Sequence, residues 1–428
     1  MSSRFYLETY GCSLNMADSD LIVGRLHQLG GERAETITES EIIILNTCGV
    51  KEPTEDKIIH RLEELSDGPI PVIVTGCLPR ISLKRVRKAN PRFAAILGPQ
   101  SLDSLGSVYE RVLAGERGIV HLDSDQSPKL QYYEGPPNSV ICTIPICEGC
   151  VGDCAYCAVK FARSDVKSYR IENILSVVKR CIHTGYKEIR LTAQDAGAFG
   201  IDSNEKLSHL LSQASNFEGT HRFRLGMFNP NLVMDNLQEL LGAMKSERFF
   251  RFFHVPLQSG SDRILQSMNR KYSVDEWKSV VSEITNQFPD ATIATDVIVG
   301  FPGETDEDFS ATLDIIKELK PGVINISKYG DRPGTKASKA QNKVKTDIKK
   351  ERSRQISSLV TDIITNKNKE WLEWQGPVLV TNPATHGGLQ GRTPSYKPVI
   401  ITDRATIGDT VIVRITSARR THLTGSIV

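Results

Sequence analysis

The sequence of 428 residues contains no long run of apolar residues and no internal repeat. No apolar stretch approaches the roughly 20 residues that a membrane-spanning helix needs. The first five residues enter a strand pattern at once, so we expect no signal peptide. Low-complexity tracts and repeats of about 20–50 residues are also lacking, which excludes solenoid and propeller architectures.

Residue groups that mark several common catalytic sites are absent as well. The nine histidines form no pair at metal-binding spacing, and we find no Ser-His-Asp set and no pair of catalytic carboxylates. The net charge of +2 neither requires nor excludes nucleic acid as a partner. With 39% hydrophobic and 24% charged residues, the composition is typical of a globular protein of two or three domains.

Cysteine supplies the strongest chemical signal, because Cys150, Cys154 and Cys157 form a C-x3-C-x2-C triplet. Nine cysteines without a secretory signal favour a reducing compartment and metal binding over disulfides. Three thiolates can hold three irons of a 4Fe–4S cube and leave the fourth iron without a protein ligand. Such an open position is where metal sites carry out chemistry, so the triplet predicts a catalytic cluster.

Zinc is the main alternative for this segment. Cys147 and Cys150 form one C-x2-C pair, and Cys154 and Cys157 form another. Zinc sites usually separate two such pairs by a dozen or more residues, whereas only three intervene here. Cys147 is also close enough in sequence to be an alternative cluster ligand. The cysteines that we expect to be structural are Cys142, Cys147 and Cys181.

Residues 1–125 are expected to form an α/β domain with a parallel sheet, because short apolar runs alternate with helical patterns. A cysteine beside a glycine follows each of three expected strands. The carboxyl ends of parallel strands share one edge, where ligands bind, so these cysteines should converge. We interpret Cys12, Cys48 and Cys77 as ligands of a second 4Fe–4S cluster with one open iron. The expected strands cover residues 4–10, 41–46 and 71–75, and the expected helices residues 19–29 and 55–65.

Residues 138–340 contain six strand patterns with helical patterns between them, which predicts a partial (βα)6 barrel. Chemistry in such barrels lies on the loops that follow the strands. Each expected strand is followed by a polar, glycine-rich or cysteine-rich sequence. The expected strands cover residues 140–146, 188–192, 222–226, 252–256, 292–299 and 323–327.

Residues 341–369 predict a basic amphipathic linker helix, and residues 370–428 predict a small β-barrel. From Gly376 onward, six Lys and Arg residues accompany two acids. Small cationic barrels often bind single-stranded or looped nucleic acid, although a solvated basic surface is the simpler alternative. The expected strands cover residues 377–381, 398–402, 409–416 and 421–428. Candidate phosphate contacts are Arg332, Arg392, Arg419 and Arg420.

Together these features resemble the methylthiotransferase family of radical S-adenosylmethionine (SAM) enzymes over almost the whole chain. The C-terminal barrel is similar to a TRAM domain, an RNA-binding module. Residues 160–169, 191–200 and 225–230 resemble the archaeal and eukaryotic branch, with departures at Ser164 and Phe228 and at residues 330–331. The motifs that carry the family resemblance are Tyr10-Gly11-Cys12 with Asn15, Asn46-Thr47-Cys48, Thr75-Gly76-Cys77, the triplet with Tyr156, and residues 257–261 and 300–305.

The resemblance implies an enzyme that inserts a methylthio group at C2 of N6-threonylcarbamoyladenosine, next to the anticodon of tRNA. It implies SAM and two 4Fe–4S clusters as cofactors. The cluster at the triplet would cleave SAM to a 5′-deoxyadenosyl radical, and the N-terminal cluster would carry the sulfur. The implied partners are tRNA and a low-potential electron donor. Because the chain stops at the end of the small barrel, we expect a free cytoplasmic protein without a membrane anchor, most simply a monomer.

Several other residues are expected to line the site. Tyr156 is expected to lie against the SAM adenine. Helix capping is the alternative role for polar residues at strand ends. Isopentenyladenosine in tRNA and a ribosomal protein are alternative substrates, and a zinc-containing RNA-binding scaffold is the non-enzymatic alternative. The candidate polar contacts to SAM or the base are Gln194, Asp195, Gln258, Ser259 and Glu304, with Thr295 and Asp296 lining the pocket.

Overall fold

The structure, a computed structural model, describes residues 3–125 and 129–428 and comprises two units. The first unit contains Met1–Pro136, Thr143–Val151 and Cys157–Val177. The second contains Pro137–Cys142, Gly152–Tyr156 and Val178–Val428. The segment with the cysteine triplet therefore contributes residues to both units, which the sequence did not indicate.

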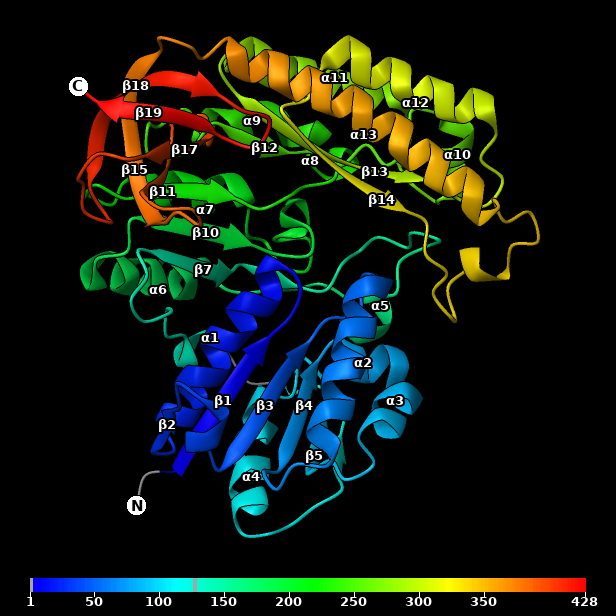
Figure 1. Cartoon of the computed structure of the whole chain (residues 1–428), viewed down its shortest axis with the longest axis vertical. Coiled ribbons are helices and arrows are strands. Elements are labelled where there is room, and N and C mark those ends of the chain that lie inside the picture. The colour runs from blue at the N-terminus through cyan, green and yellow to red at the C-terminus, as the bar shows by residue number, and fades with distance from the viewer. Residues whose placement is uncertain (1–2, 126–128) are drawn as a thin grey trace. The chain divides into compact units, whose positions relative to one another are not determined.

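A six-stranded parallel sheet forms the centre of the first unit, in the order β2-β1-β3-β4-β5-β6. Figure 1 labels β2, β1, β3, β4 and β5 of this sheet. The three expected strands are present, and β3 and β4 are buried along their whole length, as in parallel sheets covered by helices on both faces. Three further strands have three residues each, too short for a sequence pattern. The strands are β1 (Ser3–Thr9), β2 (Gly31–Arg33), β3 (Ile42–Thr47), β4 (Val72–Gly76), β5 (Ala95–Leu97) and β6 (Ile119–His121).

Helices follow the strands of this sheet and begin close to the predicted cysteine ligands. Helix α1 (Ser13–His27) begins six residues before the expected start, because the polar side chains of Asn15 and Asp18 face the protein interior and hide the apolar pattern. Its N-cap is Cys12, and the N-cap of α3 is Cys77. The other helices of the unit are α2 (Glu52–Ser66), α3 (Leu78–Ala89), α4 (Leu102–Leu113), α5 (Val159–Ala162) and α6 (Ile171–Thr184), the last of which continues into the second unit.

Six strands of the predicted partial barrel are present in two three-stranded sheets, ordered β11-β10-β7 and β12-β13-β14. Strand β10 pairs with β11 in parallel, and β13 pairs in parallel with both β12 and β14. A parallel bridge between Phe223 and Phe249 links the two sheets, and the amide of Phe228 donates to the carbonyl of His254. The strands are β7 (Ile141–Pro145), β10 (Glu188–Thr192), β11 (Arg222–Leu225), β12 (Phe252–His254), β13 (Thr292–Val299) and β14 (Val323–Lys328). The helices between them are α7 (Leu207–Ser215), α8 (Pro230–Val233), α9 (Leu237–Ala243), α10 (Asp262–Ser267), α11 (Val274–Gln287) and α12 (Asp306–Leu319).

A closed five-stranded barrel follows, in the order β15-β16-β17-β19-β18. Its core is aliphatic, and Val378, Val399 and Val413 are fully buried in it. The one strand that the sequence did not predict, β16, has the sequence Leu-Gln-Gly-Arg, which lacks an apolar alternation. The strands are β15 (Gln375–Pro383), β16 (Leu389–Arg392), β17 (Pro398–Ile401), β18 (Thr410–Ala418) and β19 (Leu423–Ile427). No helix in the described part of the chain is both long enough and apolar enough to cross a membrane.

The predicted linker helix is α13 (Thr346–Lys369), and it packs on the central barrel instead of standing free. Ile356 and Val360 are buried against Val297 and Val299 of β13. At the start of the helix, Arg352 is buried and donates to Glu304 Oε2 at 2.6 Å. The helix therefore braces the loop that follows β13.

Replacing Arg352 by alanine is expected to destabilise this unit. The change leaves the buried Glu304 carboxylate without its cation, and breaking a buried pair in this way costs about 3 kcal/mol. Urea unfolding should show a lower midpoint for Arg352→Ala. The matched change Arg354→Ala removes an exposed arginine from the same helix and should shift the midpoint little. Equal shifts in the two variants would contradict this role for Arg352.

Two candidate cluster sites

The three N-terminal cysteines lie at the carboxyl edge of the first sheet, around Asn15 on α1. The Oδ1 atom of Asn15 lies 4.0 Å from Cys12 Sγ and 3.8 Å from Cys77 Sγ. Its Nδ2 atom donates to the carbonyls of Tyr10 and Thr47, each at 2.9 Å. Asn15 therefore joins the turns that follow β1 and β3 and places two of the thiols beside one amide.

Glycine permits the third thiol, that of Cys48, to approach. Gly11 has φ +112°, and a Cβ at this position would lie 2.7 Å from Cys48 Sγ. At Gly76, which has φ +91°, a Cβ would lie 2.3 Å from the carbonyl oxygen of Thr47. Both positions exclude a side chain. The Gly-Cys pairs that the sequence singled out thus form a cradle of closely packed backbone with thiols at its edge.

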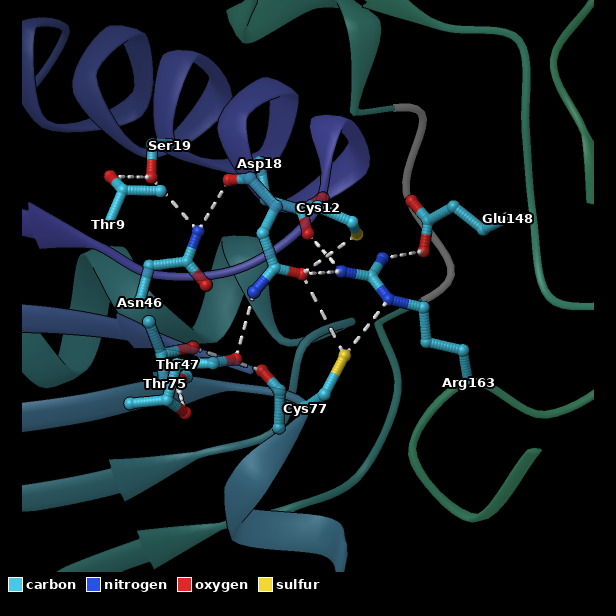
Figure 2. Close-up of polar contacts among 12 residues, drawn as sticks. Thr9, Cys12, Asp18, Ser19, Asn46, Thr47, Thr75, Cys77, Glu148 and Arg163 are labelled. Atoms are coloured by element: carbon cyan, nitrogen blue, oxygen red, sulfur yellow. Dashed lines mark hydrogen bonds and ion pairs between the residues drawn. The ribbon is translucent and has the colours of Figure 1, made fainter. Parts of the chain in front are cut away.

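A network of polar side chains lies next to Cys12 and Cys77 (Figure 2). The Nδ2 atom of Asn46 donates to Ser19 Oγ at 2.9 Å and to the carbonyl of Asn15 at 2.8 Å. The Oγ atoms of Ser19 and Thr9 lie 2.6 Å apart, and the Thr47 hydroxyl donates to the carbonyl of Thr75. Buried polar networks of this kind fix side chains in one arrangement.

Thiol donors suit an iron–sulfur cluster, since thiolate sulfur is its normal protein ligand. In the described residues, no three His, Cys, Asp or Glu side chains gather as ligands of a single metal ion. A cube differs from a single ion because each thiolate binds a different iron, so its ligands can stand further apart. The donor set and the glycine cradle therefore fit a 4Fe–4S cluster.

Sequence reasoning did not single out Arg163, a fully buried residue in the loop after α5. Its Nε atom donates to Cys77 Sγ at 3.4 Å, and its Nη2 atom donates to Asn15 Oδ1 at 3.3 Å and to Asp18 (Figure 2). A single arginine in a polar stretch carries no sequence signal of burial, so only the structure could identify it.

Glu148 connects the same group to the segment of the cysteine triplet. Its carboxylate accepts from Lys129 Nζ at 2.9 Å and from the Tyr169 hydroxyl, and it lies 3.6 Å from Arg163 Nη1. Burial alone would raise the pKa of Glu148, but Lys129 and Arg163 outweigh it and lower that pKa to about 2. Glu148 is therefore ionised at neutral pH.

The triplet itself occupies the loop between β8 (Cys147–Glu148) and α5. Cys150, Cys154 and Cys157 are half-buried, whereas Cys147 is fully buried in its strand. Gly149 has φ +79°, and a Cβ there would lie 2.1 Å from the carbonyl oxygen of Asp165. The three triplet cysteines are thus more accessible than Cys147, and their role as the ligand set stays a prediction. Cys142 and Cys181 are also buried.

In the second unit, Arg270 contacts both Cys154 and Tyr156. Its Nη1 atom lies 3.2 Å from Cys154 Sγ and 3.4 Å from the Tyr156 hydroxyl oxygen. The backbone of Ala155 is fixed between two barrel loops, since its amide donates to Met268 and its carbonyl accepts from Ala337. Arg270, like Arg163, was not predicted from the sequence.

Gln194 and Gln258 each present a buried acceptor at the end of a barrel strand. Their Oε1 atoms are buried and have no hydrogen-bond partner among the described residues. Gln258 also has φ +71°, in the left-handed region that few side chains adopt without a reason. Two orphaned acceptors at strand ends fit a polar ligand such as SAM.

Other candidate contacts have structural partners. The buried Asp195 carboxylate caps the turn Ala196–Ala198 through the amide of Gly197 and accepts from Asn229 Nδ2 at 2.5 Å. Ser259 Oγ accepts from the Ser261 amide at 3.2 Å. For these residues the capping alternative is present, and a direct contact with SAM stays a prediction.

The side chains of Glu304 and Thr295 likewise accept hydrogen bonds from backbone amides of nearby loops. Glu304 Oε2 accepts from the Gly300 amide at 2.7 Å, and Thr295 Oγ1 accepts from the Leu257 amide at 2.9 Å. Asp296 lies 2.8 Å from His254 Nε2. Arg332, a candidate phosphate contact, is buried in this structure, and its contact with phosphate stays a prediction.

Comparison with known proteins agrees with this architecture. The model of the radical SAM superfamily matches residues 144–316, that of the uncharacterized protein family UPF0004 matches residues 4–98, and that of the TRAM domain matches residues 376–428. A probable threonylcarbamoyladenosine tRNA methylthiotransferase of Pyrococcus abyssi is 39% identical over 427 residues, which cover 99% of each chain. The chain belongs to the radical SAM methylthiotransferase family. Another relative, a tRNA-2-methylthio-N(6)-dimethylallyladenosine synthase of Clostridium botulinum, is 33% identical over 99% of this chain and 96% of its own.

Methylthiotransferase membership confirms the expected family, cofactor types and fold class. SAM and two 4Fe–4S clusters are the cofactors of the family. Among solved structures, a radical SAM methyltransferase from Kitasatospora setae, with cobalamin and a 4Fe–4S cluster bound, superposes with a TM-score of 0.60 at 13% identity. That match covers 79% of this chain and 77% of the other and supports the fold alone.

Proposed function

We propose that this methylthiotransferase modifies tRNA at C2 of N6-threonylcarbamoyladenosine next to the anticodon. The main support is sequence similarity: the chain is 39% identical, over nearly its full length, to an archaeal relative that is named for this activity. The relative named for dimethylallyladenosine is less similar, at 33%. The small barrel at the C-terminus, which matches a TRAM domain, supplies the surface for RNA.

The six cysteines would hold the two clusters. Cys150, Cys154 and Cys157 would bind the cluster that takes SAM, and the three N-terminal cysteines would bind the other. When bound, SAM and its cluster supply the radical chemistry, which an aromatic C–H requires because no side chain is basic enough to remove its proton. The proposed N-terminal ligands are Cys12, Cys48 and Cys77.

The remaining residues of the site would position SAM and the base. The Tyr156 and Phe301 rings form an edge-to-face pair with centroids 6.4 Å apart, which fixes the Tyr156 ring. Tyr156 would lie against the SAM adenine. The orphaned Oε1 atoms of Gln194 and Gln258 can accept from an amino group. Arg270 holds Cys154 and Tyr156 in a fixed relation.

Substrate choice is tested by offering two tRNAs to the reconstituted enzyme. One carries threonylcarbamoyladenosine and the other carries isopentenyladenosine. We expect kcat/KM to be at least 100-fold higher for the first, about 3 kcal/mol of discrimination, because a site built for polar groups rejects a substrate that lacks them. Equal values, or a preference for the second, would reassign the substrate. Methylthiolation of a ribosomal protein that is supplied in place of both tRNAs would support a protein substrate.

The exposed pair Arg419 and Arg420 should contribute to tRNA affinity by contacting phosphates. We expect Arg419→Gln with Arg420→Gln to weaken binding and to reduce the slope of log Kd against log salt by about 1 for each lost contact. Lys317→Gln, an exposed change on α12, is the matched control. Titrations at several salt concentrations measure the slope, and an unchanged slope in the double variant would exclude the pair from the interface.

We place the reaction in the cytoplasm, where tRNA is available. An external low-potential donor would supply electrons to the triplet cluster, since the chain itself carries no further redox group in this proposal. The simplest assembly is a monomer with one tRNA.

A further inference from the structure

We propose that Arg163 is a positioning residue that sets the charge around the N-terminal cluster and thereby its reduction potential. The inference rests on the proposed function only in taking Cys12, Cys48 and Cys77 as ligands of that cluster. It concerns how this chain controls the sulfur-carrying site, beyond the identity of the ligands.

The Arg163 guanidinium lies beside one of the proposed cluster ligands. It is fully buried and donates from Nε to Cys77 Sγ at 3.4 Å. A guanidinium keeps its charge under all relevant conditions, so a permanent cation lies beside one proposed ligand. Net charge and hydrogen bonds to sulfur are among the factors that set iron–sulfur potentials. A cation in a poorly solvated position acts strongly because little water screens it.

The hydrogen-bond donors of Arg163 are incompletely paired in the described part of the chain. Its Nη2 atom donates to Asp18 and Asn15, but its Nη1 atom is buried and has no hydrogen-bond partner among the described residues. Glu148, at 3.6 Å from Nη1, is beyond hydrogen-bond length. Burying an arginine in this state is costly unless another acceptor completes the set. Cluster sulfur beside Cys77 would be an acceptor of the right kind.

The charged side chains around Arg163 nearly balance one another. Two cations, Lys129 and Arg163, accompany two carboxylates, Asp18 and Glu148, so the group is close to neutral before any thiolate is counted. A change at one of these positions therefore alters the charge that the cluster experiences. Removing the cation and removing a carboxylate should act in opposite directions.

Arg163 and Glu148 flank the cysteine triplet in the sequence, which links the two cluster sites. Arg163 follows the last cysteine of the triplet by six residues, and Glu148 precedes the first by two. Both ends of the SAM-cluster loop are thus tied to a group that contacts Cys77 of the other site. Arg163, which lies beside the N-terminal cluster site, thus belongs to the segment that carries the ligands of the SAM-binding cluster.

The test is a potentiometric titration followed by electron paramagnetic resonance. It uses the full-length chain with Cys150, Cys154 and Cys157 changed to alanine, so that the signal comes from the N-terminal cluster alone. Arg163→Gln should make this cluster at least tenfold harder to reduce at a given potential, which is a downward shift of ~59 mV for one electron. Asp18→Asn should shift the potential upward, and Arg163→Lys should restore most of the original value because it keeps the charge.

Opposite shifts in the two charge variants would support the inference, since general structural damage would not reverse its sign. If the potentials of both variants equal that of the parent chain, or shift in the same direction, the inference is overturned. Arg163 would then have only a structural role, as the partner of Asp18 and Glu148. If Arg163→Gln does not fold, an upward shift in Asp18→Asn beside an almost unchanged potential in Arg163→Lys supports the inference, and no shift or a downward shift in Asp18→Asn overturns it. Failure of the parent chain to bind any 4Fe–4S cluster would instead refute the N-terminal site of the proposed function, and this inference with it.

Discussion

Changing Cys154 to alanine should abolish formation of the methylthio nucleoside while leaving tRNA binding nearly intact. Cys154 is one of three proposed ligands of the SAM-binding cluster, and a cluster held by two thiolates would not retain its irons or present an open position to SAM. The tRNA surface, by contrast, is expected mainly on the C-terminal barrel. Nucleoside mass spectrometry measures the product, and a filter-binding assay measures tRNA affinity.

Cys181→Ala is the matched control for this change, since Cys181 is buried in α6 and belongs to neither proposed ligand set. That variant should retain its iron and its product formation. Product from Cys154→Ala at the level of the parent enzyme would show that the triplet is not the catalytic ligand set. Loss of tRNA binding together with activity would indicate a folding defect instead.

Changing Cys12, Cys48 and Cys77 together to alanine should separate SAM cleavage from transfer of the methylthio group. The triplet cluster remains, so SAM should still be cleaved to 5′-deoxyadenosine under reducing conditions. Without the second cluster there is no carrier for the sulfur, so no methylthio nucleoside should form. Iron content should fall from about eight to about four per chain, because each 4Fe–4S cube holds four.

Chromatography of the small-molecule products together with an iron assay checks this prediction. A variant that still delivers the methylthio group would refute the N-terminal cysteines as the sulfur-carrying site. A variant that holds no iron and cleaves no SAM would show that the two sites are not independent, as the contacts of Arg163 with Cys77 and Glu148 would then suggest.

Pattern and spacing predicted the elements that lie closest to the chemistry. The expected strands at residues 188–192 and 292–299 coincide with β10 and β13. In β10, Ile189 and Leu191 alternate with Glu188 and Arg190, and β13 is rich in β-branched residues, both of which are strand patterns. Glycine beside cysteine at the strand ends was informative for a physical reason. Gly11 and Gly76 have no space for a side chain. The structure therefore requires glycine at these positions, and a glycine next to a cysteine can be recognised in the sequence.

Other features could not be predicted, because they depend on distant partners. The burial of Arg163 results from Asp18, Asn15 and Cys77, which lie far from it along the chain. Glu304 was expected at the cofactor, but its partner Arg352 is supplied by a helix 48 residues later. From the sequence alone, a charged residue is expected either on the surface or in a functional site. Only the packed structure shows which charged residues are buried and paired.

The most direct test of the central claim is one anaerobic turnover experiment. Reconstituted enzyme is mixed with dithionite, SAM carrying a deuterated methyl group, and tRNA carrying threonylcarbamoyladenosine, and the digested nucleosides are analysed by mass spectrometry. The account predicts 5′-deoxyadenosine together with a methylthio-threonylcarbamoyl nucleoside that contains the deuterium label. Protein that binds zinc in place of iron and yields neither product would contradict the account and favour a non-catalytic RNA-binding scaffold.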